Sequence, residues 1–214
     1  MLTIYVFGNV PRPVIGVTRD LRVLWTAEEA GVPYRVHALD HARGELKAPE
    51  YLALNPFGKV PAIDDDGLTL FESGAIVLHL AAKTDWLLPT SPQERARATQ
   101  WAFATVDTVQ PPMTDLFVLD KFHSDKAWAA ERRPALMDSA RRQLAALERE
   151  LAARPYLLGD AFTAPDILLS SALRTIQHTD LLDGAPNIAD YKARCEARSA
   201  WRKIYAAYEQ RLAA

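Results

Sequence analysis

The segment at residues 55–63, followed by Glu72 and Ser73, constrains the fold more than any other part of the chain. Proline lacks a backbone N–H, so Pro61 is tolerated only at the start or the edge of a strand. A Val-Pro bond is also among the few that adopt the cis form at modest cost. A cis bond here would turn the backbone outward and leave the N–H and C=O of Val60 free to pair with an extended ligand. The first turn of a helix near Glu72 adds free N–H donors, so the two features together suit a peptide-like ligand with a carboxylate.

The first 83 residues alternate short β-rich runs with helical patterns. Thr18 is expected as the N-cap of the first helix, and Gly31 as the residue that ends it. Right-handed crossover connections predict that the first two strands are parallel. The expected elements are strands at 2–7, 34–38, 61–64 and 68–71, and helices at 19–30, 45–54 and 72–83.

The remainder of the chain has helical patterns throughout. Apolar residues between 136 and 151 recur at three- and four-residue steps, which places them on one face of a long helix. Thr163 and Asp166 have the spacing of a capping box, so we interpret Asp166 as a structural residue. Two further helices are expected at 187–198 and 199–211. We therefore predict a first domain at 1–83, a linker at 84–91 and a second domain at 92–214.

Three patterns in the chain are similar to those of one known family. The pattern N-P-x-G-K-V-P-A-[LI], followed by E-S, resembles the glutathione-binding segment of the glutathione S-transferase superfamily, in its bacterial cytosolic form. The capping-box segment at 156–167 and the pattern between Asn187 and Trp201 are similar to that family too. The resemblance implies a thioredoxin-like α/β domain of order β-α-β-α-β-β-α and an all-α C-terminal domain. It also implies glutathione as a co-substrate and a homodimer.

The resemblance assigns the glutathione-binding roles residue by residue. In the family the proline is cis, and the residue before it pairs through its backbone with the cysteinyl part of glutathione; Pro61 and Val60 take these places. The family's Glu-Ser pair, here Glu72 and Ser73, holds the γ-glutamyl end. A hydroxyl and an N–H at a helix start suit the α-carboxylate, and an acidic group suits the ammonium. Two lysines are candidates for the glycyl carboxylate, with a solvated side chain as the alternative for each: Lys47 and Lys59.

The residue that activates the sulfur is the part of the family pattern that this chain lacks. A transferase must lower the pKa of a thiol from about 8.5 toward neutrality, because the thiolate is the nucleophile. In the family a Tyr, Ser or Cys just after the first strand donates to the sulfur, but residues 8–17 contain none of these. The candidates are Thr18, Asn9 and Arg19. Their alternative roles are an N-cap, a turn residue and a solvated surface charge.

A second substrate would occupy an apolar pocket. Phe103, Met113 and Phe117 lie in a stretch rich in large apolar groups and are the candidates to face it, with core packing as the alternative for each. The single cysteine, Cys195, lies far from the ligand motif and is interpreted as structural. The five histidines show no paired spacing, so we predict no metal site.

Composition narrows the class of protein. The chain has 214 residues, 49% of them hydrophobic and 24% charged, and a formal net charge of −2. Neither the first 83 residues nor the rest has an excess of basic side chains, so we expect no nucleic-acid partner. No apolar run is long enough to cross a membrane and no signal peptide is recognised, so we expect no membrane partner and a cytoplasmic location.

These features predict a glutathione S-transferase that conjugates the glutathione thiolate to a hydrophobic electrophile. A second hypothesis, favoured by the missing sulfur donor, is a glutathione-binding or scaffold protein without turnover. A third is a glutathione-dependent isomerase, dehalogenase or peroxidase, since such enzymes share the glutathione site.

Overall fold

The computed structural model describes residues 1–213, which group into two compact units. One unit contains residues 1–88 together with the chain from Arg198 onward, and the other contains residues 89–197. The division after Leu88 falls inside the predicted linker. The sequence, however, placed the whole of 92–214 in one domain, whereas the last helix belongs by its contacts to the first unit. The combination of an α/β unit and a helical unit confirms the predicted thioredoxin-like and all-α organisation.

The first unit is built on a four-stranded mixed sheet of order β2-β1-β3-β4. β1 pairs in parallel with β2, as the crossover rule predicted, and the other two pairings are antiparallel. The elements of this unit are β1 (Leu2–Phe7), η1 (Arg12–Val14), α1 (Asp20–Glu29), β2 (Tyr34–Leu39), η2 (Glu45–Lys47), α2 (Pro49–Leu54), β3 (Ala62–Asp65), β4 (Leu68–Phe71), α3 (Ser73–Ala81) and α9 (Ser199–Ala213).

A tight hairpin joins β3 to β4. Asp66 and Gly67 have φ values of 53° and 92°, the left-handed conformations that a two-residue type I′ turn requires. Asp64 Oδ1 accepts the backbone N–H of Gly67 at 2.7 Å and supports the turn. The Asp-Asp-Gly sequence therefore forms the predicted hairpin.

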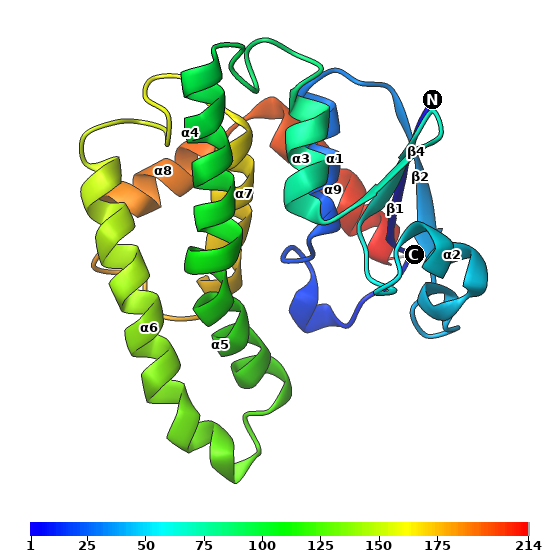
Figure 1. Cartoon of the computed structure of the whole chain (residues 1–214). Helices are drawn as coiled ribbons and strands as arrows, with labels where there is room; N and C mark the ends of the chain where they lie inside the picture. The colour runs from blue at the N-terminus through cyan, green and yellow to red at the C-terminus, as the bar shows by residue number, and fades with distance from the viewer. Residues whose placement is uncertain (214) are drawn as a thin grey trace. The chain divides into compact units, whose positions relative to one another are not determined.

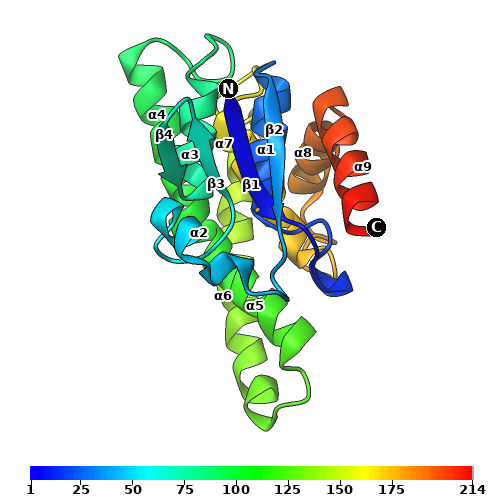
Figure 2. The same cartoon turned by 90° about the vertical axis from the view of Figure 1, so that its right-hand side faces the viewer.

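The two faces of the sheet carry different layers. Alternation along β1 sends Ile4 and Val6, both fully buried, toward the face of the sheet that α1 covers. Tyr5 and Phe7 point to the opposite face, where they pack on an apolar cluster of residues that includes Tyr51 of α2. Figures 1 and 2 show α1 and α3 on one side of the sheet and α2 on the other. The end of β1 therefore lies between two apolar layers.

Helix α9 packs against α1 within the α/β unit. The rings of Trp25 and Trp201 are 4.8 Å apart. Arg198 donates two hydrogen bonds to Glu29, at 2.6 and 2.8 Å. These contacts explain why a segment from the end of the sequence joins the unit formed by its beginning.

The second unit is helical in the part that the structure describes. A π-helical stretch, η3, interrupts the first long helix, because Pro111 and Pro112 lack the N–H groups that would continue the regular ladder. The N–H of Gln110 bonds to the carbonyl of Thr105 instead. The elements are α4 (Pro92–Phe103), η3 (Ala104–Val109), α5 (Gln110–Phe122), α6 (Ala127–Leu151), α7 (Ala164–Leu173), η4 (Arg174–Ile176) and α8 (Pro186–Glu196).

The predicted capping box at the start of α7 is confirmed. Asp166 Oδ2 accepts the N–H of Thr163 at 2.8 Å and its hydroxyl at 2.9 Å. The other carboxylate oxygen accepts the N–H of Leu157 and the hydroxyl of Tyr191, each at 2.9 Å. Asp166 is fully buried and all its contacts are structural, as predicted.

Candidate functional site

The turn before β3 presents the backbone of Val60. The Val60–Pro61 peptide bond is cis, as the sequence allows. The paired residues of β3 begin at Ala62, so the N–H and C=O of Val60 lie outside the ladder. The carbonyl of Lys59 accepts hydrogen bonds from the Tyr51 hydroxyl at 2.7 Å and from Asn55 Nδ2 at 2.6 Å. The backbone next to Val60 is therefore held by α2 and by the turn itself.

Gly58 brings this turn close to η2. Its φ is 58°, and a Cβ placed there would lie 2.6 Å from the carbonyl oxygen of Leu46 and 3.0 Å from Nζ of Lys47. The ammonium group of Lys47 thus lies beside the turn that leads to Val60. Lys47 and Lys59 are both exposed. Both predicted lysines are therefore near the candidate binding backbone and open to solvent.

The start of α3 carries the predicted Glu-Ser pair. Glu72 is exposed and has a φ of 70°, and Ser73 is the first residue of the helix and is buried. Because Glu72 does not cap the helix with its own side chain, its carboxylate remains available to a ligand. The Ser73 hydroxyl accepts a hydrogen bond from Arg22 at 3.4 Å.

Arg22 is a further residue of the candidate site, and the sequence did not indicate it. It lies in the buried part of α1, where an apolar residue is the ordinary expectation, and only 2% of its surface is exposed. Burial, together with the nearby charge of Arg19, lowers the pKa of Arg22 to about 9. The guanidinium still carries its charge at neutral pH, so a positive group lies directly behind Ser73.

The structure places Thr18 in a buried polar cluster. Its hydroxyl lies 2.7 Å from the hydroxyl of Tyr208 and is hydrogen-bonded to the carboxylate of Asp20. A threonine hydroxyl has one proton, and both of its neighbours here belong to the protein. This arrangement leaves no proton for a sulfur and argues against Thr18 as the donor. The predicted N-cap is also wrong: α1 begins at Asp20, and Arg19 occupies the cap position.

Asn9 and Arg19, the other two candidates, are exposed. Asn9 Nδ2 donates to Asp40 Oδ1 at 3.0 Å, which uses one of the two amide protons. Arg19 stands at the N-terminal end of α1, and no hydrogen bond or ion pair among the described residues engages its guanidinium. Arg19 is thus the candidate with the most donors left for a ligand.

The three residues predicted to face a hydrophobic substrate do not share one surface. Met113 is fully buried and Phe117 is 6% exposed, with its ring against Phe122 and His178. Core packing, the alternative interpretation, describes both. Phe103 is 63% exposed and keeps its candidate role.

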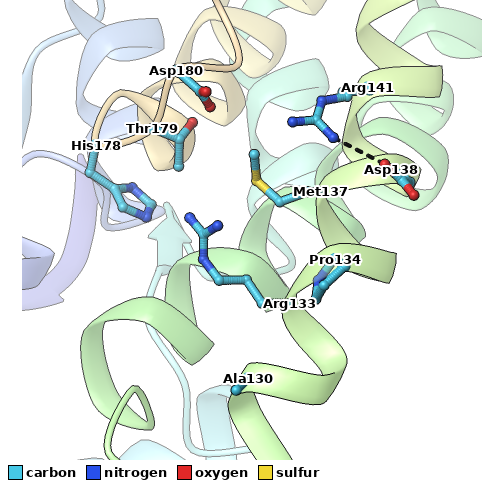
Figure 3. A pocket seen from close by; sticks show the side chains of 9 residues that line it. All are labelled: Ala130, Arg133, Pro134, Met137, Asp138, Arg141, His178, Thr179 and Asp180. Carbon is cyan, nitrogen blue, oxygen red and sulfur yellow. Dashed lines mark hydrogen bonds and ion pairs between the residues drawn. The ribbon is translucent and has the colours of Figure 1, made fainter.

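The helical unit has a groove of about 770 Å³ between α6 and the segment after α7 (Figure 3). Two hydrogen bonds, at 2.8 and 3.1 Å, pair Arg133 with Asp120, and His178 Nε2 lies 3.1 Å from the same carboxylate. Arg141 is paired with Asp138, as the dashed line in Figure 3 marks. Both arginines that line the groove are therefore already paired with carboxylates, and the groove contains none of the predicted site residues.

Residues 1–213 contain no group of three or more His, Cys, Asp and Glu side chains arranged to hold a metal ion. None of their helices combines the length and the apolar character needed to cross a membrane.

Comparison with known proteins identifies relatives over nearly the whole chain. Two family models match: glutathione S-transferase, N-terminal domain, at residues 13–82, and glutathione S-transferase, C-terminal domain, at residues 109–199. Glutathione S-transferase 4 of Zea mays is 30% identical over 192 residues, which cover 86% of this chain and 85% of the relative.

Two solved structures extend the comparison. A glutathione transferase from Burkholderia graminis, solved with two glutathione molecules bound per subunit, is 30% identical with a TM-score of 0.85 and covers 95% of this chain and 87% of its own. A family member from Pseudomonas fluorescens, also with two glutathione bound, is 26% identical with a TM-score of 0.84 and covers 95% and 92%.

Proposed function

Because the chain belongs to the glutathione S-transferase family, we propose that it binds glutathione and transfers the glutathione thiolate to a hydrophobic electrophile. The observation that carries this proposal is that two features occur together in one unit. The N–H and C=O of Val60 lie outside the strand ladder, and Glu72 and Ser73 stand at the start of α3. Both belong to the α/β unit, and both have groups that suit a tripeptide. Cytoplasmic location and a homodimeric state are part of the proposal.

The binding roles follow from charge and hydrogen-bonding capacity. The N–H and C=O of Val60 pair with the cysteinyl part of glutathione as a short strand would. The α-carboxylate is held by the hydroxyl and N–H of Ser73, with the charge of Arg22 behind them, and the ammonium by the carboxylate of Glu72. Lys47 and Lys59 serve the glycyl carboxylate.

Activation of the sulfur is assigned to Arg19, with Asn9 as the alternative. A positive charge at the N-terminal end of α1 favours the thiolate over the thiol. The thiol proton leaves to solvent, and the sulfur lone pair forms a C–S bond with the electrophile. A leaving group departs with its electron pair in a displacement, and a proton from water completes an addition. Phe103 remains the candidate contact for the electrophile.

Binding is tested by calorimetric titration with glutathione. We expect wild-type protein to bind, and Ser73→Ala and Glu72→Gln each to raise Kd about tenfold, because each removes a charge-assisted contact. Ser170→Ala, a buried serine of the helical unit, and Glu50→Gln, an exposed acid of α2, are matched controls that should leave Kd unchanged. Absence of wild-type binding at millimolar glutathione would exclude the transferase and the glutathione-dependent alternatives together.

The same titration reports stoichiometry, which bears on the alternative activities. The Burkholderia graminis and Pseudomonas fluorescens proteins each hold two glutathione molecules. Two equivalents bound here would favour a reaction between two thiols, such as glutathione-dependent peroxide reduction. One equivalent and turnover with an aromatic halide would favour conjugation, and binding without turnover would favour the scaffold hypothesis.

A further inference from the structure

The hydroxyl of Tyr208, on the C-terminal helix α9, lies inside the α/β unit at the end of the loop formed by residues 8–17. The side chain is fully buried. Its oxygen is 2.7 Å from Oγ1 of Thr18 and accepts the backbone N–H of Gly16 at 3.4 Å. One hydroxyl thus bonds to two positions of the loop end, about 190 residues earlier in the chain.

The bonds continue from Thr18 to both sides of the loop. Thr18 donates to Asp20, and Asp20 Oδ2 accepts the N–H of Phe7 at 3.1 Å. Burial raises the pKa of Tyr208 to about 12, so the phenol keeps its proton at neutral pH. Because the single proton of Thr18 goes to Asp20, the phenol is the donor in its contact with Thr18. The loop is therefore tied at its beginning, through Phe7, and at its end, through Gly16 and Thr18, to one cluster.

Arg211, one turn further along α9, keeps Tyr208 in place. Its guanidinium carbon lies 5.2 Å from the centre of the Tyr208 ring, and its Nη2 lies 3.6 Å from Asp20 Oδ2. The ring of Tyr205 is stacked with the ring of Tyr208, and 6.3 Å separates their centres. The phenol consequently has little freedom to move away from the loop.

We propose that Tyr208 is a positioning residue for sulfur activation: through Thr18 and Gly16 it sets where the loop ends and α1 begins. Arg19 follows Thr18 directly in the chain, so a shift of Thr18 displaces the proposed sulfur activator. Asn9 lies at the other end of the same loop. This inference rests on the proposed function, and it assigns to Thr18 an indirect role in place of donation to the sulfur.

Removal of the hydroxyl alone tests the proposal. Tyr208→Phe keeps the ring and its packing but leaves Gly16 N–H and Thr18 Oγ1 without their buried partner. We expect the pKa of bound glutathione, followed by thiolate absorbance against pH, to rise by about 0.5 to 1 unit, and kcat to fall about three- to tenfold. Kd for glutathione should change less than about twofold, because Val60, Glu72 and Ser73 are not in this cluster.

Variants at Thr18 separate positioning from general loss of stability. Thr18→Val should reproduce the effect of Tyr208→Phe, the double variant should add little to either, and Thr18→Ser should restore wild-type behaviour. Tyr191→Phe removes an equally buried tyrosine hydroxyl, in the helical unit, and should lower stability without moving the thiol pKa. An unchanged thiol pKa in Tyr208→Phe, or additive effects in the double variant, would overturn the proposal.

A measurement without ligand keeps this inference distinct from the proposed function. In hydrogen exchange, amides of residues 9–18 should exchange faster in Tyr208→Phe than in wild type, while α3 stays protected. If glutathione does not bind but this exchange pattern is observed, the proposed function is rejected, while the hydrogen-bonded link between α9 and the loop is retained. Unchanged exchange at 9–18 would reject the tie itself.

Discussion

At the scale of single residues, Gly58 shows how closely the binding turn is packed. Its positive φ favours glycine, and a Cβ would also meet the Leu46 carbonyl at 2.6 Å. Gly31 has a similar φ of 64° with nothing within 4 Å of a Cβ. The two glycines therefore separate the cost of the backbone conformation from the cost of a clash.

We expect Gly31→Ala to lower the free energy of unfolding by about 1 kcal/mol, the cost of a positive φ alone. Gly58→Ala should cost about 1 to 3 kcal/mol more and should weaken glutathione binding, because the turn before Val60 has to shift. Urea denaturation and calorimetry measure the two effects. Equal losses in both variants would contradict the predicted clash.

At the scale of elements, Asp65 ties β3 to α3. Its Oδ2 lies 2.7 Å from His79 Nε2 and 2.7 Å from Lys83 Nζ. The hydrogen bond from Lys83, with that from His79, holds the pKa of Asp65 below its usual value of 3.8. An acid with a depressed folded-state pKa stabilises the fold above its unfolded-state pKa and loses that contribution as pH falls through the folded-state value.

Asp65→Asn should therefore be less stable than wild type near neutral pH, and the difference should shrink as pH falls below 3.8. Urea denaturation across that range measures the difference, and Asp138→Asn, at an exposed ion pair of α6, is the control with a near-zero effect. A difference that grows as pH falls would contradict the assignment.

The capping box of α7 belongs to the same scale. Asp166→Ala leaves four buried donors, on Leu157, Thr163 and Tyr191, without their acceptor. We expect a loss of about 2 to 4 kcal/mol in the free energy of unfolding, more than an ordinary N-cap contributes. Chemical denaturation checks this value, and a loss under 1 kcal/mol would show that the buried donors find other partners.

At the scale of the whole molecule, the α/β unit includes a helix from the end of the chain. Trp25 is fully buried, and Trp201 of α9 packs on it. A chain ending at residue 197 should lose hydrogen-exchange protection in β1 and α1, because Trp25 becomes exposed. Peptides from α5 to α8 should keep their protection. Unchanged protection of α1 would show that α9 is dispensable to this unit.

The assembly state is tested at this scale as well. We expect analytical ultracentrifugation to give the mass of a homodimer, about twice the 23.8 kDa of the chain. A single species at 23.8 kDa across micromolar concentrations would reject this part of the proposal.

Local chemistry in the sequence was sufficient for much of the molecule. The Asp-Asp-Gly hairpin, the parallel first strands and the capping box at Thr163 depend on residues close together in the chain or on a general rule of chain connection. The cis form of the Val60-Pro61 bond is likewise allowed by its local sequence, whereas the binding roles of Val60, Glu72 and Ser73 come from the family resemblance and stay predictions. In each case short-range sterics and hydrogen bonding decide the conformation.

Only the tertiary structure decided the contacts between distant segments. It packed α9 on α1 and buried Met113 in the helical core. It also brought Arg22 within hydrogen-bonding distance of Ser73 and hydrogen-bonded the Thr18 hydroxyl to Tyr208. Thr18 and Tyr208 are 190 positions apart, and no periodicity or motif in the sequence links them. The physical reason is that a hydroxyl has a single proton, and which neighbour receives it depends on packing that the whole fold determines.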